Sequence, residues 1–167
     1  MTKTDNASFL NVSVRSSDRL VALTPRGFRP LAARAVGAVS TIRELVPTGE
    51  GPENWRQMIT IQSIDGQAYT NPAAFLRSFG ESYVNACPNA QHTNILNGSV
   101  EGRSTSALML TCPTGPNSGL AETTFVKCLQ GAKFLYVVQF AFRGEITDVD
   151  RDRAVEYLKT VKVVADL

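Results

Sequence analysis

The chain has 167 residues, of which 43% are hydrophobic and 19% are charged, and its formal net charge is +2. A chain of this length and composition can bury the core of one globular domain. Its basic residues are scattered rather than clustered, which argues against nucleic acid as a partner. No stretch approaches the roughly 18 consecutive apolar residues of a membrane span, so we expect no transmembrane segment.

The N-terminal stretch differs in composition from the rest of the chain. Residues 1–17 are polar and rich in Ser, Thr and Asn, and they lack the apolar segment of a signal peptide. We therefore predict a disordered tail over 1–17 and a single domain over 18–167. On this evidence the protein is either cytosolic or an exported protein shown without its leader.

The first predicted elements are strands. RLVALT (19–24) leads into the turn PRGF, and AVSTIRELV (38–46) alternates until Pro47 ends it. RQMITIQSI (56–64) is the third strand and is followed by the turn signal Asp65-Gly66. The segment over 29–39 stays ambiguous.

A helix is the next predicted element. Asn71 is a favourable N-cap and Pro72 suits the first helical position. Apolar residues then recur at helical spacing, at Phe75, Leu76, Phe79, Tyr83 and Ala86. This stripe should cover one face of a sheet.

Two hairpins and a second helix complete the pattern. Strands over 92–96 and 103–112 form the first hairpin, and strands over 123–130 and 133–142 form the second. The strand over 133–142 is apolar on both faces, which is typical of a central, covered strand. Asp148 is the predicted cap of a final helix with a core stripe at Ala154, Val155, Leu158 and Val161. The predicted fold class is α+β, an antiparallel β-sheet with helices packed on both faces, that is, an α/β/α sandwich.

The order of these elements resembles the PsbP/DcrB-like α/β/α sandwich over about residues 18–165. The similarity rests on PRGF at 25–28, the strand after Trp55, the hairpin through Gly131 and the closing helix over 148–161. The resemblance implies a periplasmic or lumenal protein. Fold alone implies no activity.

A second resemblance rests on one longer segment. LVPTGEGPENWRQMITIQ (45–62) is similar to a pattern carried by uncharacterised exported bacterial proteins. The resemblance implies export and no particular activity.

Three cysteines bear on the compartment. Cys87 and Cys112 each precede a proline at the end of a predicted element, whereas Cys128 lies inside a strand. We predict a Cys87–Cys112 disulfide, with Cys128 as a buried thiol. The alternative is three unrelated thiols in a cytosolic protein. Because disulfides persist in oxidising compartments, the bridge favours a periplasmic or secreted protein.

The sequence contains few residue patterns that are typical of catalytic or cofactor sites. His92 is the only histidine, and a Cys87/His92 nucleophile–base pair would require Cys87 to be a free thiol. No zinc-type spacing, phosphate-binding loop or hydrolase motif occurs. We therefore expect no catalytic residues, no cofactor and no metal.

Trp55 allows two interpretations. Its alignment with Ile59 and Ile61 favours a lid on the core, with the indole N–H bonded to a loop carbonyl, over a ligand platform. Any ligand cleft is expected between the 47–55 and 113–119 loops. The candidate ligand or partner surface comprises Trp55, Glu50, Arg56, His92 and Asn117.

The favoured function is an exported, non-enzymatic accessory or binding protein with a protein or small-molecule partner. An inhibitor or immunity-type interaction protein is the alternative, and a small hydrolase is third.

Overall fold

The computed structural model describes residues 18–31, 34–36, 40–65 and 71–166. The predicted tail over 1–17 and Gly66 of the predicted turn lie outside them. The strands are β1 (Asp18–Val21), β2 (Phe28–Pro30), β3 (Arg34–Val36), β4 (Ser40–Pro47), β5 (Gln57–Asp65), β6 (Gln91–Val100), β7 (Arg103–Cys112), β8 (Glu122–Gln130), β9 (Phe134–Arg143) and β10 (Lys162–Ala165). The helices are α2 (Pro72–Ala86) and α3 (Asp148–Thr160).

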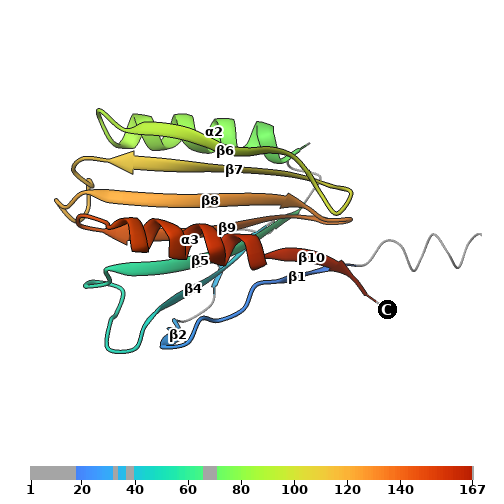
Figure 1. The fold of residues 1–167 in the computed structure, drawn as a ribbon, viewed down its shortest axis with the longest axis horizontal. Helices are drawn as coiled ribbons and strands as arrows, with labels where there is room; N and C mark the ends of the chain where they lie inside the picture. The colour runs from blue at the N-terminus through green and yellow to red at the C-terminus, as the bar shows by residue number, and fades with distance from the viewer. Residues whose placement is uncertain (1–17, 32–33, 37–39, 66–70, 167) are drawn as a thin grey trace, which may run out of the picture.

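Most of the described chain belongs to one antiparallel sheet. Its strand order is β2-β4-β5-β9-β8-β7-β6, and β3 pairs beside β2 on β4, which makes eight strands. The terminal strands β1 and β10 form a separate antiparallel ribbon. Figure 1 shows the long strands running side by side and the ribbon at their lower right.

Two apolar clusters share the central strands, because successive side chains of a strand point to opposite sides. In β9, Val138 and Phe140 belong to the cluster that packs against Ala154 and Leu158 of α3. Val137, which points to the opposite side of β9, belongs to the cluster around Phe75 and Leu76 of α2. The apolar character of β9 on both sides is thereby explained.

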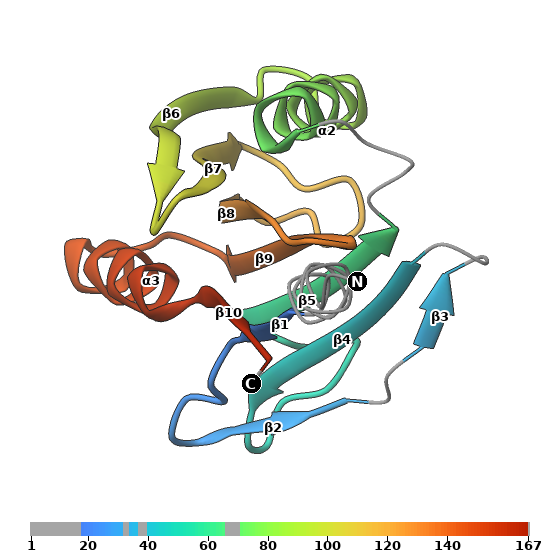
Figure 2. The same cartoon turned by 90° about the vertical axis from the view of Figure 1, so that its right-hand side faces the viewer.

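The predicted α/β/α sandwich, with helices packed on both faces, is wrong. The described residues contain two helices against ten strands, so the molecule is mostly β and has no helical layers. Helix α2 contacts β6, β7 and β8, and α3 contacts β8 and β9. Farther along the sheet, Leu20 and Phe28 from the first strands take part in the core with Leu45 and Ile59. An eight-stranded sheet is too wide for two short helices to cover (Figure 2).

The helix starts show how local chemistry sets the boundaries. The predicted cap at Asn71 is confirmed, since its side chain accepts a hydrogen bond from the Ala74 N–H at 2.8 Å. The predicted cap at Asp148 is wrong. Thr147 caps α3 instead, in a capping box with Asp150, because Asp150 at the third helical position can bond back to the cap.

Among the described residues, no helix is long and apolar enough to cross a bilayer.

Candidate functional site

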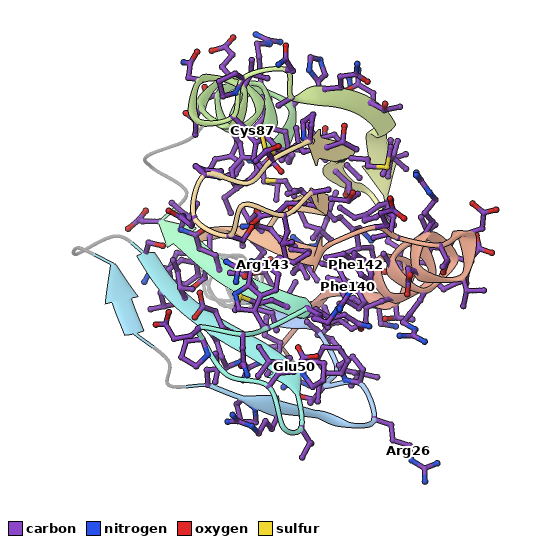
Figure 3. All side chains as sticks on the ribbon, turned by 90° about the vertical axis from the view of Figure 1, so that its left-hand side faces the viewer. Arg26, Glu50, Cys87, Phe140, Phe142 and Arg143 are labelled. Atoms are coloured by element: carbon purple, nitrogen blue, oxygen red, sulfur yellow. A yellow bond between two sulfur atoms is a disulfide. The ribbon has the colours of Figure 1, made fainter. Side chains whose placement is uncertain are left out.

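The loops named in the sequence analysis meet at one end of the sheet. β5 and β8 begin there, and β7 and β9 end there. The residues that connect the loops are Trp55, Ser118, Glu122 and Arg143, and we call them the loop-end network. Figure 3 looks onto this end, with Arg143 between Cys87 beside α2 and Glu50 in the 47–55 loop.

Arg143 is the centre of the loop-end network. Its guanidinium carbon lies 3.8 Å from the centroid of the Trp55 ring, which is a cation–π arrangement. Its Nε donates to Glu122 Oε1 at 3.2 Å, and the same oxygen accepts from the Ser118 hydroxyl at 2.8 Å. A Cβ at Gly115 would lie 2.6 Å from Glu122 Oε1, so a larger residue there would displace the Glu122 carboxylate from its present position. The network joins both loops through side chains that pair with one another by hydrogen bonds and charge.

Glu50 and Arg56 also stabilise the 47–55 loop. The Glu50 carboxylate accepts from the Arg56 backbone N–H at 2.8 Å, and the Arg56 carbonyl accepts from the Arg143 N–H at 2.9 Å. Trp55 is half-buried against Arg143, and no described residue bonds to its indole N–H. Its role as a structural lid stays a prediction. Asn117 is exposed, and its side chain bonds to no described residue.

The predicted disulfide is confirmed. Cys87, at the end of α2, is bridged to Cys112, at the end of β7, across 25 positions of sequence. Cys128 is a free, buried thiol, as predicted, and burial raises its pKa. The bridge ties the end of α2 to the sheet beside the start of β6. A Cys87/His92 nucleophile–base pair is therefore ruled out, because Cys87 has no free thiol.

His92 lies apart from the loop-end network, in a hollow between α2 and β6. This hollow has a volume of about 470 Å³. Its lining is Leu76, Arg77, Gly80, Glu81, Val84, Asn85, His92 and Leu108. Apolar side chains of the helix and of β7 form its floor, and Gly80 adds no side chain of its own. A Cβ placed there would meet nothing within 4 Å.

A second hollow of about 230 Å³ continues along β6. It shares Leu76, Arg77, His92 and Leu108 with the first hollow. Its further lining is Ala73, Asn94, Leu96, Asn97, Ser106 and Ala107. We refer to the two hollows together as the α2–β6 groove.

The groove carries polar groups that remain available. The side chains of Arg77 and His92 make no hydrogen bond or ion pair with any described residue. Ser106 and Asn97 bond to each other at 3.0 Å beside them. The Arg77 guanidinium and the His92 imidazole therefore lie next to an apolar floor, with the carboxamides of Asn94 and Asn97 beside them. Such a set can hold an anionic group.

Of the predicted surface residues, the structure brings only His92 into the groove. Sequence reasoning missed Arg77, Asn94, Asn97 and Ser106. Arg77 lies on the outer side of the predicted helical stripe, and nothing local shows that β6 passes beside it. Judged from residue type alone, these four positions would be assigned to ordinary protein surface.

No group of three or more potential metal-ligating side chains occurs in the described part of the chain.

No family model matches the sequence, and no curated protein matches it. The fold is similar to that of LpqN, described in its crystal structure as involved in cell envelope biogenesis of Mycobacterium tuberculosis. The TM-score is 0.50 at 14% sequence identity, and the match covers 89% of this chain and 84% of the LpqN chain. At this identity the similarity shows the fold alone.

Proposed function

We propose that the protein is an exported accessory protein that binds an amphiphilic organic anion in the α2–β6 groove. The observation that carries the proposal is the pairing of unengaged Arg77 and His92 with an apolar floor. Unpaired donors beside apolar surface suit a ligand with one anionic group and one apolar body.

The size of the groove supports a small-molecule ligand. Ligand-binding hollows commonly measure about 300–1,000 Å³, and the larger part of the groove measures about 470 Å³. The anionic group would sit in the smaller part, next to Arg77, Asn97 and Ser106. The apolar body would lie over Leu76 and Leu108 along α2.

Export is supported by the disulfide and by the fold neighbour. Disulfides persist in oxidising compartments, and Cys87 and Cys112 are bridged. LpqN is described as involved in cell envelope biogenesis, which is compatible with an envelope role for this chain.

The loop-end network supports the choice of the groove as the site. Arg143, Glu122 and Glu50 are engaged with each other or with backbone groups, so they stabilise loops in the unbound protein. A ligand there would have to displace those contacts.

Isothermal titration with dodecyl phosphate, dodecanoate and dodecyl maltoside, each below its micellar concentration, tests the proposal. We expect the two anions to bind and the neutral glycoside to bind more weakly. Arg77→Gln should weaken dodecyl phosphate binding about tenfold, the effect of losing one charged hydrogen bond. Gly80→Leu should block both anions by filling the floor of the groove.

Arg26→Gln is the matched control. Arg26 is exposed and lies far from Cys87 beside α2 in Figure 3, so its substitution should leave the affinity unchanged. Absence of binding by the unmodified protein would refute the proposed ligand class. Equal affinity for all three probes, unaffected by Arg77→Gln, would show that only apolar contact is involved.

A further inference from the structure

Strand β6 forms an open edge of the sheet. It ends the strand order and pairs only with β7 among the described residues. Its first nine residues are exposed, from Gln91 to Ser99. Half of its backbone N–H and C=O groups therefore point away from the sheet, where another strand can pair with them.

The other end of the sheet is protected in a way that β6 is not. β2 has three residues, which include Arg29 and Pro30, and β3 beside it on β4 also has three. Short length, charge and proline all discourage the addition of a strand. β6 has ten residues, QHTNILNGSV, without proline, lysine, arginine or a carboxylate. A bulge between Asn94 and Leu96 is its one irregularity.

The middle of β6 is also apolar and uncovered. Ile95 is 44% exposed and Leu96 is 38% exposed. Beside them lies a hollow of about 240 Å³, on the side of α3. Ala107, Val155 and Leu158 line it together with these two residues, and Lys127 and Lys159 complete the lining. Added apolar side chains would be buried there.

We infer that β6 pairs with β6 of a second copy of this chain, antiparallel and about a two-fold axis between Ile95 and Leu96. In this register Thr93 faces Gly98 of the second copy, and Asn94 faces Asn97. The bulge lies at the axis, so the two four-residue arms on either side of it carry the pairing. Ile95 and Leu96 of both copies meet at the centre beside the two apolar hollows.

A second copy fits this edge because β6 is compatible with itself. A two-fold axis repeats every charge of a strand on its partner, and like charges opposed in a sheet are destabilising. β6 carries none of the four charged residue types. Pairing also closes the assembly, since the ends of the joined sheet are then two copies of the edge formed by the short strands β2 and β3. This arrangement explains why the β2 end of the sheet is protected against strand addition and the β6 edge is not.

Light scattering coupled to size exclusion tests the inference on the full chain. We expect twice the monomer mass of 18.1 kDa. Leu96→Lys places two lysines beside the axis, and Thr93→Lys places one lysine in each arm of the pairing. Each variant should raise the dimer dissociation constant about a hundredfold. Circular dichroism verifies that both variants fold. Leu23→Lys is the control, since Leu23 is an equally apolar residue, 65% exposed, outside the sheet.

A monomeric unmodified protein at roughly 1 mM would overturn the inference. So would a dimer that persists in both β6 variants, because the contact would then use another surface. Dissociation by Leu23→Lys as strongly as by the β6 variants would also contradict it.

Discussion

Lys127 is the most unusual single residue of the core. It is 6% exposed, and its ammonium donates to the carbonyls of Leu158 and Val161, each at 2.8 Å. These carbonyls belong to the end of α3, where a positive charge is favourable. Burial lowers the pKa of Lys127 below its ordinary value of 10.5, and the charge of Glu101 opposes this effect. The buried charge of Lys127 therefore stabilises the C-terminal end of α3.

Lys127→Met should lower the free energy of unfolding by about 1–3 kcal/mol at neutral pH, because a buried carbonyl loses its donor. The pH dependence has a definite sign. The folded protein releases the Lys127 proton at a lower pH than the unfolded chain does, so the unfolded chain binds more protons between the lowered pKa and 10.5. Stability of the unmodified protein relative to Lys127→Met should therefore rise with pH in that window. Urea melts at several pH values up to about 10.5 measure this difference. A difference that is constant or shrinks would contradict it.

At the scale of elements, α3 depends on a narrow apolar stripe. Ala154 and Leu158 are buried, whereas Glu156 and Lys159 form an exposed ion pair at 2.6 Å. Its capping box and acidic first turn favour the helix locally. Tertiary burial must supply the rest, because isolated helices of this length are marginal.

Leu158→Ala should therefore cost about 2–5 kcal/mol of unfolding free energy, the usual range for truncating a buried leucine. Glu156→Ala is the control on the outer face and should stay within about 0.5 kcal/mol. Denaturant melts of the two variants separate these effects. A Leu158→Ala protein as stable as the parent would mean that α3 is peripheral to the core.

Elements with a strong repeating pattern were predictable from the sequence. α2, with its Asn71 cap, and the alternating strands β5, β8 and β9 were found within one or two residues. β2 and β3 were missed because three-residue strands are too short to show alternation, and they form by pairing with β4. Thr147 was missed as a cap because Asp148 and Asp150 are equally good local candidates. The boundaries of helices and strands depend on tertiary contacts, which the local sequence pattern does not show.

At the scale of the whole molecule, layer arrangement was less predictable than the elements. The apolar pattern of β9 correctly indicates burial on both sides, but it does not state whether helices, strands or loops provide the cover. The groove residues Arg77 and Ser106 come from α2 and β7, 29 positions apart in the chain. Only the packing of α2 against the sheet brings them together.

The disulfide acts at this same scale, since it links the end of α2 to the sheet. Mass spectrometry after alkylation of the denatured, non-reduced protein should find one accessible thiol, at Cys128. Replacing both Cys87 and Cys112 by Ser should lower the unfolding free energy by about 3 kcal/mol, as expected for a loop of this size in the chain-entropy model. Three alkylated thiols would disprove the bridge and remove its support for export.

The placement of the three cysteines also constrains the order in which the chain folds. Cys128 follows Cys112 by 16 positions, whereas the native pair spans 25, so an unfolded chain closes the wrong loop more readily. In the native sheet Cys128 is 0% exposed and cannot reach an oxidant. The correct bridge is therefore favoured when β8 has entered the sheet before oxidation. An oxidant that acts before the sheet forms would trap a misbridged chain, which then needs thiol–disulfide exchange to recover.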